Sequence, residues 1–188
     1  AAFLGELARK GPRAFYRGAN AEAIARAVGT APRNPAPMAT GDIAGYKVRQ
    51  RDPVCAPYRG WRICGMGPPS SGATTVLGML GMLERFDMGT LGKDSPVAWH
   101  LFAEAQRLAY ADRERYLADP DFAQVPTAGL IAPAYLAARA QLIAPDRSMP
   151  SVAPGTPAGA SLAQADTLTP DVASTSHFSV IDKHGQTV

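Results

Sequence analysis

The sequence predicts an α+β fold that is mostly helical and carries a small β-hairpin. Three observations indicate this. Apolar residues recur at helical spacing in several segments, most clearly over 95–117. Two short strand-like segments, near 46–55 and 61–66, flank the pair Arg59-Gly60, which is typical of a tight turn. The 188 residues are 46% hydrophobic and 19% charged, which is the composition of a globular protein.

The part of the chain before the hairpin predicts two helices and a loop. Residues 1–10 are apolar at helical spacing and end at a Gly-Pro pair. Because they start within a helical pattern, without Met or a leader, we expect a piece cut from a longer precursor. Residues 18–29 predict a helix, with Asn20 available as its cap. Residues 30–42 are interrupted by prolines that cannot donate hydrogen bonds, so we expect a loop.

The two expected strands carry the two cysteines of the chain, Cys55 and Cys64. A turn at Arg59-Gly60 sets them opposite each other. Opposed cysteines form a disulfide in an exported protein, or stay reduced as two small buried hydrophobic residues. We favour the reduced pair, because the geometry between neighbouring strands is often unsuitable for a disulfide.

A sharp turn and an apolar helix of about four turns are expected over residues 67–86. The backbone amides near Ser70–Ala73 begin this helix and are placed to hold an anion. The lysine of a nucleotide-binding loop is missing, so we interpret the stretch as a structural turn and cap.

The strongest helical pattern covers residues 95–117. Ser95 is expected to cap the helix, and Pro96 occupies its first position. One face is predicted to be apolar and carries Val97, Leu101, Ala105 and Leu108. A further helix is expected to start at Pro133.

Residues 146–174 differ in composition from the helical body expected over 1–145. They contain no aromatic residue and are rich in Pro, Ala, Ser, Thr and Gly. We therefore expect a flexible connector that cannot bury a core. Residues 175–188 then begin a strand hairpin, with a turn predicted at 182–185, and the hairpin is cut short by the end of the chain.

Charge and composition exclude several classes of protein. The formal net charge is +3 and the pI is near 9.0. Lys47, Arg49 and Arg51 alternate along the first expected strand, and we interpret them as a solvated face. Nucleic-acid binding needs a denser basic patch with aromatic platforms, so no nucleic-acid partner is expected. No apolar run approaches the ~20 residues that span a bilayer. Two Cys and three scattered His are too few for a metal site, and we predict none.

Six stretches carry a further signal through their joint order and spacing. They are GPRAFYRGANAEAIA, GDIAGYKVRQRDPV, YRGWRICGMGPPSSG, LERFDMGTLG, EAQRLAYADRERYLADPDFAQVP and TSHFSVIDKHGQTV. Each stretch alone is a weak signal. The ordered set resembles the gamma-glutamyltransferase (gamma-glutamyltranspeptidase) family of N-terminal-nucleophile hydrolases, over nearly the whole chain.

The resemblance implies that the chain is the helix-rich part of a four-layer αββα fold, incomplete here. In that family a precursor cuts itself before a Thr that opens a strand, and the large and small chains stay associated. Thr175 matches that Thr, so the resemblance implies autocleavage between Ser174 and Thr175. Residues 1–174 then resemble the later part of a large subunit and 175–188 the start of a small subunit, which together form a heterodimer.

The chemistry of a threonine suits this position. A Thr hydroxyl is a poor nucleophile at neutral pH and needs a base beside it. An exposed α-amine has a pKa of about 7.7–8.0, so a useful fraction is neutral and accepts the hydroxyl proton. Cleavage of the Ser174–Thr175 bond creates that amine on the nucleophile itself. The cleavage fits an N-to-O acyl shift followed by hydrolysis of the ester.

The reaction implied by the resemblance is attack of Thr175 on the γ-glutamyl amide of glutathione or a similar small molecule. The γ-glutamyl group then passes to water or to an amino acid, with no metal or organic cofactor. The resemblance also implies a periplasmic or secreted protein. The substrate-binding residues are expected outside this chain, so we expect the isolated fragment to be inactive.

Two other functions stay open. The stretches NPAPMATGD and GPPSSGA depart from the family pattern and leave the acyl group undetermined, so a related amidase such as a cephalosporin acylase is one alternative. The other is a non-catalytic structural fragment in which Thr175 is silent.

Other polar residues invite a catalytic interpretation. His177 shares the face of Thr175 on the expected strand, but we interpret it as a strand residue, because the free amine supplies the base. Glu104, Asp112 and Arg113 suggest acid–base chemistry, but their spacing along the helix favours helix-packing ion pairs.

Overall fold

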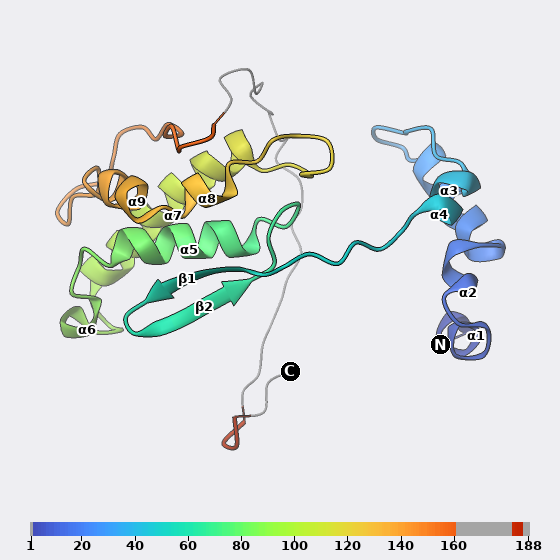
Figure 1. Ribbon diagram of the computed structural model, residues 1–188, viewed down its shortest axis with the longest axis horizontal. Helices are drawn as coiled ribbons and strands as arrows, with labels where there is room; N and C mark the ends of the chain where they lie inside the picture. The colour runs from blue at the N-terminus through green and yellow to red at the C-terminus, as the bar shows by residue number, and fades with distance from the viewer. Residues whose placement is uncertain (1, 161–181, 186–188) are drawn as a thin grey trace. The chain divides into compact units, whose positions relative to one another are not determined.

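The computed structural model describes residues 2–160 and 182–185 (Figure 1). The chain divides into two compact units, Ala1–Gln50 and Arg51–Val188. The described residues are mostly helical and contain one two-stranded sheet, in agreement with the predicted α+β class. Within these residues, no helix is both long and apolar enough to cross a bilayer.

The described residues of the first unit form four helices, α1 (Ala2–Lys10), α2 (Arg13–Tyr16), α3 (Ala19–Gly29) and α4 (Thr40–Gly45). Gly11 and Gly18 have φ angles of 64° and 70°, so they separate the first three helices with left-handed backbone. Ala21 on α3 is fully buried, and α3 packs beside α2 and α4. Both helices that the sequence predicts here are confirmed.

Two local predictions in the first unit are wrong. The Asn20 side chain does not cap α3; it donates to the Phe15 carbonyl oxygen at 2.9 Å, and Gly18 occupies the cap position. The expected loop over residues 30–42 is confirmed as far as residue 39, but its last three residues belong to α4. This short helix starts because the Asp42 carboxylate accepts a hydrogen bond from the Ala39 N–H at 2.8 Å.

The second unit begins with an antiparallel hairpin of β1 (Val54–Tyr58) and β2 (Trp61–Gly65). The predicted turn is confirmed, because Arg59 and Gly60 have φ angles of 48° and 84° between the paired strand ends. The left-handed backbone of Arg59 is held in place by its N–H, which donates to Glu84 Oε1 at 3.1 Å.

The first strand is shorter than predicted. Val54 pairs with Gly65 at the end of the ladder, and the chain after Gly65 turns away toward a helix. The residues before Val54 therefore have no partner strand in this sheet. Lys47, Arg49 and Arg51 precede the strand, so their interpretation as one face of a strand is wrong.

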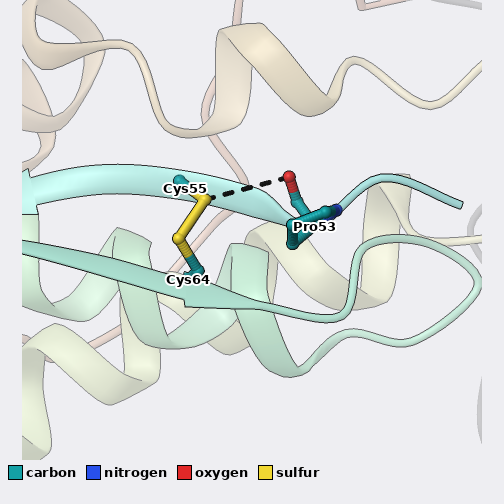
Figure 2. Close-up of a disulfide and its surroundings, with 3 residues drawn as sticks. All are labelled: Pro53, Cys55 and Cys64. Carbon is teal, nitrogen blue, oxygen red and sulfur yellow. Dashed lines mark hydrogen bonds between the residues drawn. A yellow bond between two sulfur atoms is a disulfide. The ribbon is translucent and has the colours of Figure 1, made fainter.

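The two cysteines are joined by a disulfide (Figure 2). Cys55 and Cys64 are direct partners in the register of the hairpin, and their Cα atoms lie 4.1 Å apart. The Pro53 carbonyl oxygen lies 3.9 Å from Cys55 Sγ. The two residues lie directly opposite each other, as the predicted turn requires, but the expectation of a reduced pair is wrong, because this cross-strand geometry does accommodate the disulfide.

The rest of the second unit is helical. Its described helices are α5 (Gly72–Leu83), α6 (Met88–Leu91), α7 (Pro96–Tyr116), α8 (Thr127–Leu130) and α9 (Pro133–Ala140). Helix α5 contacts both strands of the hairpin and also α7, α8 and α9, so it lies between the hairpin and the other helices (Figure 1). The approach of α9 is close, because a Cβ on Gly81 would meet the Leu136 side chain.

The hydrophobic core is centred on α5, α7 and α9. Its most deeply buried large side chains are Met82, Leu101 and Leu108. The Ser95 side chain caps α7 and accepts from the Ala98 N–H at 3.3 Å, as predicted. Val97 was expected on the apolar face but is 38% exposed, because Ala98 occupies the buried position one residue later.

Replacing Leu101 by Ala is expected to lower the free energy of unfolding of the full-length protein by about 2–5 kcal/mol, because the side chain leaves a cavity. The matched change Val97→Ala, on the same helix but exposed, should cost less than about 1 kcal/mol. Urea denaturation measures both. Equal costs for the two variants would show that the assignment of the buried face is wrong.

The double replacement Cys55→Ser/Cys64→Ser is expected to lower the free energy of unfolding by about 2–3 kcal/mol, because the closed loop restricts the unfolded chain. Urea denaturation with and without a thiol reductant measures this effect. The reductant should destabilise the wild type and leave the variant unchanged. A wild type that contains two free thiols by thiol titration would contradict the disulfide.

Candidate functional site

The structure describes the polypeptide that leads toward the predicted autocleavage site. Ser174 and Thr175, which that prediction names, lie outside the described residues, and so does His177. Beyond them the turn predicted at residues 182–185 is confirmed, because the Gly185 N–H donates to the Asp182 carbonyl oxygen at 3.1 Å. On the other side, the chain is described as far as residue 160.

Residues 149–158, the anchored segment, are hydrogen-bonded to α7 and α9. The carboxylate of Asp112 on α7 is at the centre of this attachment and is only 5% exposed. It accepts from the Gly155 N–H at 2.7 Å, from the Arg139 guanidinium at 3.1 Å and from the Tyr135 hydroxyl at 2.8 Å. One carboxylate thus joins both helices and the segment.

Arg139 on α9 completes the buried pair. Its guanidinium is bonded to Asp112 and also donates to the Ala153 carbonyl oxygen at 2.9 Å and the Leu108 carbonyl oxygen at 3.3 Å. A buried guanidinium needs such acceptors, because each unmet donor carries a desolvation cost. Burial and the neighbouring Asp112 carboxylate raise the pKa of the Tyr135 hydroxyl, so Tyr135 remains a hydrogen-bond donor at neutral pH.

Gly155 packs closely against α7 and α9. Its carbonyl oxygen accepts from the Tyr116 hydroxyl at 2.6 Å. A Cβ at this position would meet the Tyr135 hydroxyl and lie 3.0 Å from Arg139 Cδ. A side chain at this position would therefore have to displace Tyr135 and Arg139 or move the segment.

Glu104 holds the start of the anchored segment. Its carboxylate is 2% exposed and accepts from the Met149 N–H at 2.8 Å and from Arg107 at 2.8 Å. Arg107 also donates to the Met149 carbonyl oxygen at 2.9 Å. Burial raises the pKa of the Glu104 carboxyl, but the Met149 N–H and the Arg107 guanidinium outweigh it, so its pKa lies below the usual value.

The far end of the segment packs on α8. A Cβ on Gly129 would meet the backbone carbonyl oxygen of Ala158, so the two backbones are in direct contact. The neighbouring Pro157 is buried. The segment is therefore attached at its beginning, its middle and its end.

These attachments contradict part of the expectation for residues 146–174. Met149 and Val152 pack against the hydrophobic core, so the expectation that the stretch cannot bury apolar groups is wrong for them. The composition was misleading because backbone groups, rather than side chains, make the polar attachments. Residues 161–174 lie outside the described residues.

The polar residues of α7 act in packing, as predicted. Glu104 pairs with Arg107, and Asp112 pairs with Arg139. Arg113 donates to the Ser71 hydroxyl at 3.0 Å and so links α7 to the start of α5. Asp112 continues the buried stripe of α7, and this position was the available signal that a buried partner is needed.

The start of α5 is a structural turn, as predicted. The Gly72 N–H donates to the Ser70 hydroxyl at 3.2 Å, and the Ala73 N–H donates to the Met66 carbonyl oxygen at 3.2 Å. These amides are occupied by the protein and are not turned toward a ligand. No group of three or more His, Cys, Asp or Glu residues able to hold a metal ion occurs within 2–160 and 182–185.

This arrangement of helices and hairpin is found in solved structures. The crystal structure of Helicobacter pylori gamma-glutamyltranspeptidase matches with a TM-score of 0.70 and 37% identity, over 82% of this chain and 44% of that chain. The fold is therefore the helix-rich α+β part of an N-terminal-nucleophile hydrolase, as predicted. The sequence profile of the family described as gamma-glutamyltranspeptidase matches residues 1–188, and the chain belongs to that family.

Curated relatives carry two kinds of name. The chain is 38% identical over 184 residues to the glutathione hydrolase proenzyme of Escherichia coli (strain K12), covering 97% of this chain and 30% of that protein. It is 39% identical over 148 residues to the acylase ACY 1 proenzyme of Pseudomonas sp. (strain V22), covering 79% of this chain and 26% of that protein. The chain thus spans less than a third of the length of these relatives.

The lowered pKa of Glu104 predicts a pH dependence of stability. Its ionised form is favoured in the folded state, so its contribution is fully present above the ordinary carboxyl pKa of 4.5 and is lost as the pH falls through the lower folded value. Glu104→Gln should therefore lower the free energy of unfolding at pH 7 by about 1–3 kcal/mol and have a smaller effect near pH 3.

Urea midpoints of the full-length protein between pH 7 and pH 3 measure this. Glu6→Gln is the matched control, because the pKa of Glu6 is also lowered, by Lys10, but its side chain is exposed. The control should change little at any pH. A Glu104→Gln effect that is the same at pH 7 and pH 3 would contradict the role of the charge.

Proposed function

We propose that the complete protein transfers or hydrolyses γ-glutamyl groups of glutathione-like amides, with Thr175 as the nucleophile. The observation that carries the proposal is membership of the gamma-glutamyltranspeptidase family over residues 1–188, which includes Thr175. The proenzyme names of the relatives support processing of a precursor. The proposed bond is Ser174–Thr175, and its cleavage produces a large and a small chain that stay together.

In the proposed mechanism the Thr175 hydroxyl acts as the nucleophile twice, first in the precursor and then in the mature enzyme. In the precursor, Thr175 Oγ1 attacks the carbonyl carbon of Ser174, and the acyl group moves from nitrogen to oxygen. The C–N bond breaks as this ester forms, which frees the α-amine of Thr175, and water then hydrolyses the ester to release the Ser174 carboxylate and the Thr175 hydroxyl. In the mature enzyme this amine accepts the hydroxyl proton as Oγ1 attacks the γ-glutamyl carbonyl carbon, and the amine of the substrate leaves with a proton. Water or an amino acid then removes the γ-glutamyl group, without a cofactor.

Export to the periplasm or the cell exterior is part of the proposal. The Cys55–Cys64 disulfide supports it, because disulfides persist in oxidising compartments and are rare in the cytosol.

A second candidate is an acylase that uses the same nucleophile on another acyl group. The 39% identity to the acylase ACY 1 proenzyme supports it. The two candidates differ in the acyl group, so parallel assays with γ-glutamyl-p-nitroanilide and with an N-acylated cephalosporin separate them. Hydrolysis of the cephalosporin alone would favour the acylase.

The full-length protein is expected to convert from one polypeptide into two, and the smaller one should begin at Thr175. Intact mass and N-terminal sequencing over time measure this. Thr175→Ala should stay uncut, because it lacks the hydroxyl. Thr175→Ser keeps a hydroxyl at the same position and should be cut at the same bond. A wild type that stays intact, or an Ala variant that is cut at the same bond, would overturn the proposal.

A further inference from the structure

A small cavity lies where α5, α7, α8 and α9 meet. Its volume is about 10 Å³, measured as the space open to the centre of a water molecule. Most of its lining is apolar, but Thr75 of α5 and Asp112 and Arg113 of α7 also line it. A cavity of about this size holds one water molecule when several polar groups are within reach, and it is too small for a larger ligand.

The hydroxyl of Thr75 lacks a hydrogen-bond partner. Its Oγ1 atom is buried and bonds to no group among the residues that the structure describes. A threonine inside a helix often turns its hydroxyl to the carbonyl oxygen four residues earlier. Here that oxygen belongs to Ser71, and it already accepts from the Thr75 N–H at 2.9 Å and from the Thr74 hydroxyl at 3.2 Å. Both lone pairs of the Ser71 oxygen are used, so the Thr75 hydroxyl needs another partner.

The carboxylate of Asp112 has room for one more hydrogen bond. Its Oδ1 atom accepts from the Gly155 N–H and from the Arg139 guanidinium. Its Oδ2 atom accepts from the Tyr135 hydroxyl alone within residues 2–160 and 182–185. An ionised carboxylate offers about four acceptor sites, so one site on Oδ2 remains.

We propose that this cavity binds one water molecule, which joins α5 to the Asp112 carboxylate. The water bonds to the Thr75 hydroxyl and donates to Asp112 Oδ2. Arg113 supplies a third contact, because its guanidinium carries further N–H donors beside the Nε–H that is bonded to Ser71. A buried water typically makes about three hydrogen bonds, and these three residues provide them.

The water extends the hydrogen bonds of Asp112 to α5, the helix on which the hairpin packs. Asp112 itself lies on α7 and is bonded to α9 through Arg139 and to the anchored segment through Gly155. With the water in place, one carboxylate connects three helices and the segment. The water site does not depend on the proposed function.

Thr75→Val in the full-length protein tests the site through the sign of its effect on stability. Valine keeps the shape of the side chain and removes the hydroxyl. With water bound, the change removes one partner of the water, so the equilibrium constant for unfolding, measured by urea denaturation, should rise about two- to tenfold. In a dry cavity the variant would be stabilised, because valine would remove a buried hydroxyl without a partner. A stabilised or unchanged variant would therefore overturn the inference.

Val76→Thr is the matched control. It exchanges the same two side chains at the next residue of α5, where the side chain is 47% exposed. Valine and threonine have similar helix propensities, so the unfolding constant of this variant should stay within error of the wild type. A stabilisation of the control as large as the destabilisation of Thr75→Val would assign the effect to helix propensity and would count against the water.

A crystal structure of the full-length protein locates the water directly. One ordered water is expected within hydrogen-bond distance of both Thr75 Oγ1 and Asp112 Oδ2. In the Thr75→Val structure this water should be displaced or lost. A wild-type cavity without a water, or a Thr75 hydroxyl turned to a protein acceptor, would show that the proposed site is wrong.

Discussion

The buried ion pair between Asp112 and Arg139 is the interaction on which the second unit depends. It joins α7 to α9 at 3.1 Å inside a low-dielectric core, where an unmet charge is costly. Neither helix satisfies both groups by itself. The remaining bonds come from Tyr135, from the Leu108 carbonyl oxygen and from the backbone of residues 153–155, so the cost of burying the charges organises a stretch of small residues.

The hairpin packs on the side of α5 that faces away from α7 and α9. The disulfide closes the hairpin across one pair of opposed residues, and the Arg59 backbone at the turn is bonded to Glu84 just beyond α5. Helix α5 thus has the hairpin on one side and α7 and α9 on the other (Figure 1). Because the hairpin and the helices α7 and α9 pack on opposite sides of α5, this apolar helix buries residues around most of its surface.

Several elements were predictable because the sequence patterns that specify them cover only a few neighbouring residues. The Arg59-Gly60 turn and the Ser95 cap each depend on a few neighbouring residues. The start of β1 was not predictable, because it depends on where β2 stops pairing. The cap of α3 was also missed, because the Asn20 side chain is bonded to a carbonyl oxygen in the preceding turn of chain. The candidate nucleophile came from family resemblance, and residue spacing alone would leave Thr175 an ordinary polar residue.

Periodicity along the chain was enough to place Asp112 on the buried stripe of α7, because helical geometry repeats every 3.6 residues and needs no distant partner. The hydrogen-bond partners of Asp112 could not be predicted in this way. Arg139 and Gly155 are 27 and 43 residues away, and only the packing of α9 and the course of the anchored segment bring them to the carboxylate. The helical repeat therefore determined on which face of α7 this carboxylate lies. Only the tertiary structure determined which groups bond to the Asp112 carboxylate. Hydrogen bonds between residues distant in sequence form only where the packed core lets the backbone approach.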